Sequence, residues 1–95
     1  MNPDAIPVAL FRLGRIVATA HALEVIPKED ILKAIARHQA GDWGDLPAED
    51  LIANNKSVIE GSRLLSAYHS TQGVKFWVIT EADRSITTVL LPEDY

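Results

Sequence analysis

VKFWVITEADRSITTVLLPEDY, residues 74–95, is the stretch that decides the fold. It holds two runs rich in β-branched and aromatic side chains, Val74 to Thr80 and Ser85 to Leu91, on either side of the polar segment Glu81 to Arg84. Two such runs joined by a short polar segment are typical of an antiparallel hairpin. We therefore expect this hairpin to form the centre of a β-sheet.

A further strand is expected just before the hairpin. The run Arg63 to His69 (RLLSAYH) fits a strand that turns through Ser70 to Gly73 into the final pair. The last third of the chain is therefore predicted to be a meander of three consecutive strands.

The first apolar run, Val8 to Thr19, fits two structures. Some of its apolar residues alternate like one face of a strand, while others are spaced like a helical stripe. We expect a strand, because Gly14 in mid-run is about 1 kcal/mol unfavourable in a helix. Thr19 can cap a short helix from Ala20 to Val25, and Met1 to Pro7 predicts an irregular lead-in.

A longer helix is expected to start at Pro27 and to end before Gly41. Glu29 and Asp30 lie in its first turn, where the helix dipole favours acidic side chains. One apolar stripe follows, and it consists of Ile31, Leu32 and Ile35.

Another helix is expected from about Leu46 to Glu60. Asp45 is its predicted cap, Pro47 lies near its start, and Gly61 suits the position just after its end. Its buried face is expected to consist of four apolar residues, Leu51, Ile52, Val58 and Ile59.

This order of elements predicts one α+β domain over residues 1–95. The sheet is expected to have about four strands, to be mostly antiparallel, and to be covered by helices on one face. The first strand is expected at an edge or in the centre, beside the last hairpin.

The composition restricts the partners. Nine Lys and Arg against thirteen Asp and Glu give a formal net charge of −4, so a nucleic acid could bind only through a local basic patch. The chain has no Cys, and its His residues lack metal-site spacing, so neither a metal nor a cofactor is expected. No uncharged run approaches ~18 residues, which predicts a cytoplasmic protein without a membrane partner.

Four residues are candidates for catalysis. His38 could act as a general acid or base, because the ordinary pKa of imidazole lies near neutrality. Arg63 or Arg84 would then stabilise developing charge, and Tyr68 would orient the substrate. A lone His has little specificity, so a structural role at the helix end is favoured for His38.

The glycine-flanked loop that holds Asp42, Trp43 and Asp45 is a candidate binding site. Its indole either plugs the core or contacts a partner, and the first role is favoured because Trp usually buries much of its area. Asp45 is also the predicted helix cap.

The hairpin tip and the last residue are further candidates for binding. Glu81 and Asp83 could hold a cation, and Arg84 could hold a phosphate, although a solvated turn is the more common outcome. At the acidic end of the chain, the aromatic ring of Tyr95 completes the predicted binding residues.

Three segments carry a resemblance to a known family. RHQAGDWGD (Arg37 to Asp45), GSRLLSAYH (Gly61 to His69) and FWVITEADRSITTVLLPEDY (Phe76 to Tyr95) resemble a family of small bacterial proteins commonly borne by plasmids or mobile elements. Its members are described as plasmid-related proteins or labelled type I restriction subunit M. The resemblance covers nearly the whole chain and implies no established activity, and 95 residues leave no room for a methyltransferase domain.

Two functions remain open. The favoured one is an interaction or accessory protein of a plasmid or mobile element, which binds a protein through the Gly41 to Asp45 loop and the acidic termini. An anti-restriction or anti-defence protein could work in this way, and a homodimer that pairs exposed strand edges is the simplest form. The alternative is a metal-independent ribonuclease, because the element order resembles that of RelE- and barnase-like enzymes.

Overall fold

Four strands form one mixed sheet in the computed structural model, which describes residues 8–95. They are β1 (Arg15–Ala18), β2 (Leu64–His69), β3 (Lys75–Thr80) and β4 (Ile86–Leu90). The spatial order is β1-β4-β3-β2, with β1 parallel to β4 and the other two pairings antiparallel. The predicted α+β class, the meander and the place of the first strand beside the last hairpin are confirmed. The lead-in predicted for Met1 to Pro7 lies outside the described residues.

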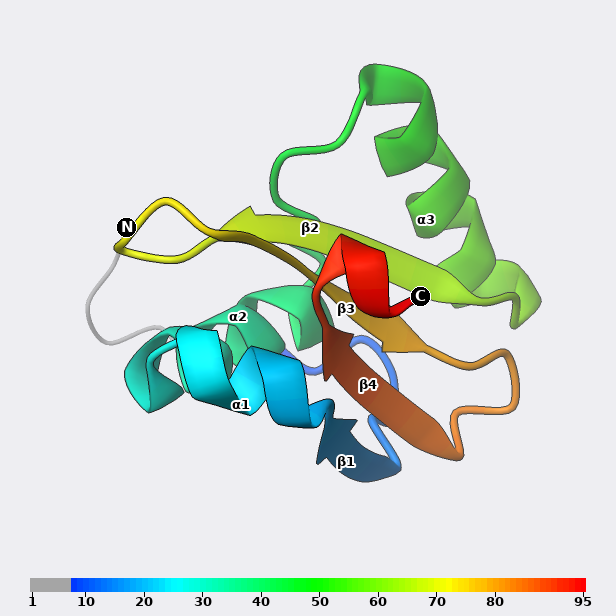
Figure 1. Ribbon diagram of the computed structural model, residues 1–95. Helices are drawn as coiled ribbons and strands as arrows, with labels where there is room; N and C mark the ends of the chain where they lie inside the picture. The colour runs from blue at the N-terminus through cyan, green and yellow to red at the C-terminus, as the bar shows by residue number, and fades with distance from the viewer. Residues whose placement is uncertain (1–7) are drawn as a thin grey trace.

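The helices are α1 (Ala20–Val25), α2 (Lys28–Gln39) and α3 (Ala48–Glu60). Figure 1 shows α1 and α2 on one face of the sheet, while α3 runs alongside β2, at the sheet edge opposite to β1. A short 3₁₀ turn, η1 (Pro92–Asp94), follows β4.

The strand predicted for Val8 to Thr19 is confirmed but is much shorter, because β1 begins only at Arg15. Gly14 causes the late start: its φ is +65°, and a Cβ atom there would lie 2.3 Å from the carbonyl oxygen of Ser85. Thr19 caps α1 as predicted, since its hydroxyl accepts a hydrogen bond from Ala22 N at 3.1 Å.

The stripe predicted for α2 is right at two positions and wrong at the third. Ile31 and Ile35 are buried, but Leu32 is 57% exposed. The sheet instead meets the helix along buried residues spaced by three, four and seven, which are Ile31, Ala34, Ile35 and His38. The polar His38 thus takes the place in the stripe that Leu32 was expected to fill.

The buried face predicted for α3 is wrong. Ile52 and Ile59 are 68% and 88% exposed, Leu51 and Val58 are half-buried, and Asn54 is the only buried residue of the helix. The reason is the position of α3, which lies along the side of β2 instead of over the sheet and therefore buries only a narrow line.

Asp45 does not cap α3, which corrects a second expectation for this helix. The cap residue is Pro47, without a side-chain hydrogen bond. The Asp45 carboxylate instead contacts Nδ1 of His69 at 2.7 Å. Gly61 ends the helix in the left-handed conformation, with φ of 78°, as its position after the last turn predicts.

The main core lies between the sheet and the pair α1 and α2. Successive strand residues point to opposite faces, so alternate positions of β2, β3 and β4 face these helices. The buried cluster consists of Ala22, Ile26, Ile31, Ala34, Ile35, Tyr68, Phe76, Val78, Val89 and Leu91.

The outer edge of β2 is closed by polar groups that imitate a further strand. The Asn54 side chain donates to Leu65 O at 2.7 Å and accepts from Leu65 N at 3.3 Å. Two residues along, Ala67 N donates to Trp43 O at 3.1 Å, and Asp45 N donates to Ala67 O at 2.7 Å. These contacts satisfy outward-pointing backbone groups of β2 at both positions.

This closure predicts the cost of losing Asn54. Replacement Asn54→Leu leaves the N–H and C=O of Leu65 without their partner, so we expect the free energy of unfolding to fall by about 1–3 kcal/mol. Urea denaturation measures the change. Ile52→Ala, on the exposed side of the same helix, is the control and should stay within about 0.5 kcal/mol of wild type. Equal stability of Asn54→Leu and wild type would contradict the closure.

Candidate functional site

The first catalytic candidate, His38, lies in the interior with no exposed surface. Its ring contacts Ser66 Oγ through Nδ1 at 2.5 Å and Thr80 Oγ1 through Nε2 at 2.9 Å. Burial, and next the charge of Arg84, lower the pKa of His38 to about 4. The imidazole is therefore neutral at physiological pH.

The hydrogen bonds around His38 fix the position of its proton. Thr87 donates to Leu13 O at 2.6 Å, so its oxygen must accept from Thr80, 2.7 Å away. Thr80 has then used its only proton and accepts from Nε2 of His38. Nδ1 is left as the acceptor for Ser66. Because Ser66 is also fully buried, this serine–histidine pair has no access to a substrate.

Within residues 8–95, none of the other catalytic candidates is hydrogen-bonded to His38. Tyr68 is buried, donates to Asp42 O at 2.6 Å, and has its pKa raised to about 12 by burial. Arg84 donates to Ser57 O at 3.0 Å and to Ser62 O at 2.6 Å, which ties the hairpin tip to the end of α3.

Arg63 lies in a different part of the molecule. It lines a cavity with Ile79 and Leu90, whose positions alternate with the strand residues that face α1 and α2. Arg63 is therefore on the opposite side of the sheet from His38 and Tyr68. This placement gives no support to the ribonuclease alternative.

The loop candidates divide into one buried and two exposed side chains. Trp43 is 3% exposed; its indole donates to Asn55 Oδ1 at 2.9 Å and stacks on Phe11 at a ring distance of 6.1 Å. Asp42 is exposed and binds Arg37 through both oxygens, which holds the pKa of that carboxyl below its usual range. Asp45 is also exposed. The indole of Trp43, in contrast, is buried and offers no surface to a partner.

Two of the predicted binding residues, Glu81 and Tyr95, do come together, around the catalytic candidate Arg63. Arg63 donates to the Tyr95 hydroxyl at 2.7 Å, and its Nε lies 3.6 Å from Glu81 Oε1. They border a cavity of about 320 Å³. The remaining candidate, Asp83, accepts from Ser85 N and Oγ in a local turn. These three polar side chains therefore pair with one another at the surface, where Tyr95 is 69% exposed.

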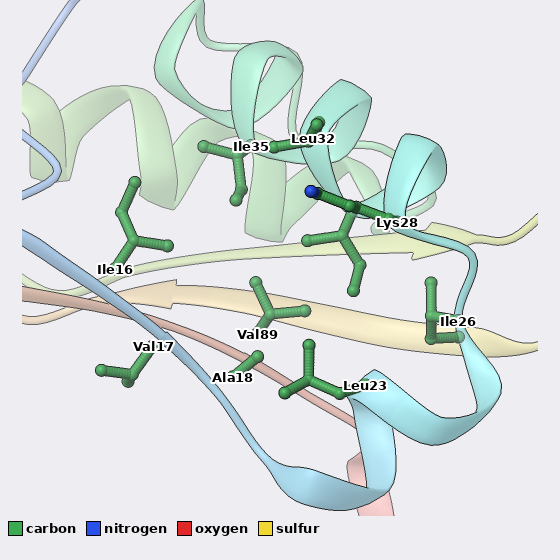
Figure 2. Close-up of a pocket in the computed structure, with 10 residues that line it drawn as sticks. Ile16, Val17, Ala18, Leu23, Ile26, Lys28, Leu32, Ile35 and Val89 are labelled. Atoms are coloured by element: carbon green, nitrogen blue, oxygen red, sulfur yellow. The ribbon is translucent and has the colours of Figure 1, made fainter.

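An open apolar surface lies elsewhere, between β1, α1 and α2. It is a groove of about 430 Å³ with Val89 of β4 in the middle of its lining residues, while the Val17 side chain points away from the helices (Figure 2). Ile16, Leu23 and Leu32 border it and are 49%, 63% and 57% exposed. The complete lining is Ile16, Val17, Ala18, Leu23, Ile26, Lys28, Ile31, Leu32, Ile35 and Val89. We call this surface the β1 groove.

The backbone edge beside the β1 groove is open. Arg15 N donates to Ser85 O and Thr19 N donates to Val89 O, so odd-numbered residues of this segment face β4. The N–H and C=O groups of Ile16 and Ala18 therefore point away from the sheet. No group within residues 8–95 forms a backbone hydrogen bond with them.

Sequence reasoning missed the groove residues, although one signal pointed to them. The two helices that follow β1 carry more large apolar residues than one buried stripe requires, and Leu23 and Leu32 are the surplus. The open side of β1 could not be found in this way, because the assignment of even and odd residues depends on the pairing with β4.

The structure gives two further findings on partners. Within residues 8–95, no three His, Asp or Glu side chains come close enough together to hold a metal ion. Of the helices in that range, none has both the length and the apolar character needed to cross a membrane.

Comparison of the chain with protein-family models, curated proteins and solved structures found no match in any of the three. The resemblance to plasmid-borne proteins therefore stays a prediction.

The buried imidazole predicts how stability depends on pH. The unfolded chain takes up the His38 proton near pH 6.5, but the folded protein does so only near pH 4. The stabilisation is therefore complete above about pH 6.5 and declines as the pH falls to about 4, by about 3 kcal/mol in total. Urea denaturation between pH 7.5 and 4.5 should show a smaller decline in His38→Gln than in wild type.

His21 provides the control for this measurement. Its hydrogen bond to Asp94 raises the pKa of His21, so this residue acts in the opposite direction and cannot cause the decline. The variant His21→Gln should therefore keep it. Parallel curves for wild type and His38→Gln would contradict a neutral, buried His38.

Proposed function

We propose that this protein is a protein-interaction module that binds a strand of a partner chain at the open edge of β1. The β1 groove receives apolar side chains of that strand. The observation that carries the proposal is the contrast between the two sheet edges. β2 is closed by Asn54 and the loop that contains Trp43, whereas the outer groups of Ile16 and Ala18 have no backbone partner within residues 8–95.

Unpaired strand edges are a hazard, because they pair with other chains, and folded proteins usually protect them. This chain protects the edge of β2 with the buried amide of Asn54 and a loop. Of the two sheet edges, only that of β1 is therefore left open within residues 8–95. Binding by strand addition uses such an edge: backbone hydrogen bonds hold the added strand, and pockets for alternate side chains select it.

The β1 groove provides the apolar pocket that would select the side chains of the partner strand. Ile16 and Ala18 line it together with residues of α1 and α2, so the groove lies directly beside the open backbone groups. β1 has only four residues and offers few hydrogen bonds, so the apolar contacts must supply much of the affinity. Lys28 is the one ionisable residue of the lining. The partner strand is therefore expected to carry apolar residues at alternate positions.

The proposal retains the protein-binding class but changes its location. The sequence pointed to the Gly41 to Asp45 loop, whose Trp43 ring is buried between Phe11, His38 and Asn55. An accessory role in a plasmid or mobile element, directed against restriction or another defence, stays a prediction. It is compatible with strand addition, because that mode of binding makes no demand on the biological setting of the partner.

Peptide binding tests the proposal directly. A fluorescein-labelled peptide that alternates Ile and Thr should bind the wild-type protein, and an isomer with its Ile residues clustered at one end should bind at least tenfold more weakly, because it cannot place alternate side chains in the groove. Fluorescence anisotropy measures both affinities. Leu32→Asp, which puts a charge beside the groove, should weaken binding of the alternating peptide at least tenfold.

Ile59→Asp is the control, because Ile59 is an even more exposed apolar helix residue, 88% against 57% for Leu32, and lies on α3, outside the groove lining. This variant should bind like wild type. Amide exchange gives a second reading, since the N–H groups of Ile16 and Ala18 should become protected when the peptide is added. Equal binding by wild type and Leu32→Asp, or unchanged exchange at both amides, would exclude the proposed site.

A further inference from the structure

We infer that the partner at β1 is a second copy of this chain, paired antiparallel so that the sheet continues from one molecule into the other. This inference rests on the proposed function, since it uses the same open edge and groove. The inference identifies the chain that occupies this edge, whereas the difference between the β1 and β2 edges does not identify it. Two further observations carry it, the symmetry of the outward backbone groups and the charges at the two ends of β1.

The outward backbone groups of β1 are self-complementary about Val17. A twofold axis at this residue places Ile16 opposite Ala18 of the second copy, and Ala18 opposite Ile16 of the second copy. The outward groups of both residues have no backbone partner within residues 8–95, so each pair can exchange both of its hydrogen bonds. Val17 then faces its own counterpart across the axis, as a closed two-copy interface requires.

The same register brings the two grooves together. Ile16 and Ala18 point to the same side of the sheet as Val89, toward α1 and α2. In the paired arrangement, Ile16 of each copy lies beside Ala18 of the other, at the entrance of the other groove. The exposed Leu23 and Leu32 border this entrance, so each copy supplies an apolar side chain to the groove of the other.

The charges at the ends of β1 favour antiparallel pairing. Arg12 and Arg15, at the start, are exposed and form no salt bridge within residues 8–95. At the other end, the Thr19 hydroxyl donates to Asp94 Oδ2 at 2.8 Å, which holds the acidic pair Glu93 and Asp94 beside it.

Antiparallel pairing therefore brings the basic start of each strand to the acidic end of the other. Parallel pairing would place like charges together at both ends. The charges thus select a second copy in the orientation that the backbone symmetry also requires.

Sedimentation equilibrium tests the inference. The wild-type chain is expected to form a dimer of twice its 10.4 kDa mass. Ala18→Pro removes an N–H that points away from β4, so the sheet within one copy stays intact while the dimer dissociation constant rises at least tenfold. Ile16→Lys, which places a charge on the edge, should have the same effect without a change of backbone. Ile59→Asp should dimerise like wild type.

A charge exchange tests the orientation. Arg15→Glu removes positive charge from the start of β1, and Glu93→Arg removes negative charge from its end. Each variant alone should dimerise at least tenfold more weakly than wild type, because like charges then meet. An equimolar mixture should form a heterodimer, since the acidic start of one chain meets the basic end of the other. A mixture no more dimeric than its components would overturn the antiparallel register.

The outcomes separate this inference from the proposed function. A wild-type monomer that binds the alternating peptide, and loses it with Leu32→Asp, would overturn the second copy as partner and keep strand addition. A monomer that binds no such peptide would overturn both. A dimer that is unaffected by Ala18→Pro and Ile16→Lys would show that copies associate through another surface, which also overturns the inference.

Discussion

The fold depends on a buried imidazole that has a partner for each of its nitrogens. His38 links α2 to Ser66 on β2 and Thr80 on β3, and the network continues through Thr87 of β4 to the carbonyl of Leu13. A shift of one residue in any of these strands would turn its polar residue to the other face and leave a buried group unpaired. The network therefore specifies the register of the sheet as well as the position of α2.

The same network determines where β1 lies. Leu13 accepts from Thr87 just before the chain reaches Gly14, whose backbone packs directly against Ser85. β1 then pairs with β4 through its odd-numbered residues, which leaves the groups of Ile16 and Ala18 on the outside. The open edge is thus attached to the core, and a partner strand would meet it already in an extended conformation.

Local signals in the sequence predicted the elements well, and long-range pairing explains the failures. The hairpin, the Thr19 cap and the Gly61 helix end each depend on neighbouring residues, and each was found. His38 could not be recognised as a core residue, because its partners lie 28 and 42 positions away in the sequence. The prediction of the buried face of α3 was wrong for a related reason. Periodicity shows that a helix has an apolar side, but it does not show whether another element covers that side.

The large apolar residues that are exposed on α3 and around β1 are all about half exposed or more, yet their surroundings differ. Ile52 and Ile59 stand on the outside of a helix, separated by the polar Asn55 and Lys56, and single apolar side chains of this kind are common on protein surfaces. Around β1 the exposed side chains converge on one groove and lie beside backbone groups that have no partner within residues 8–95. A partner strand bound here would pair the backbone groups and remove apolar area from water at the same time. Ile52 and Ile59 lie on a helix, where no strand edge accompanies the apolar side chains. The backbone edge, more than apolar exposure itself, is what distinguishes the groove as an interface.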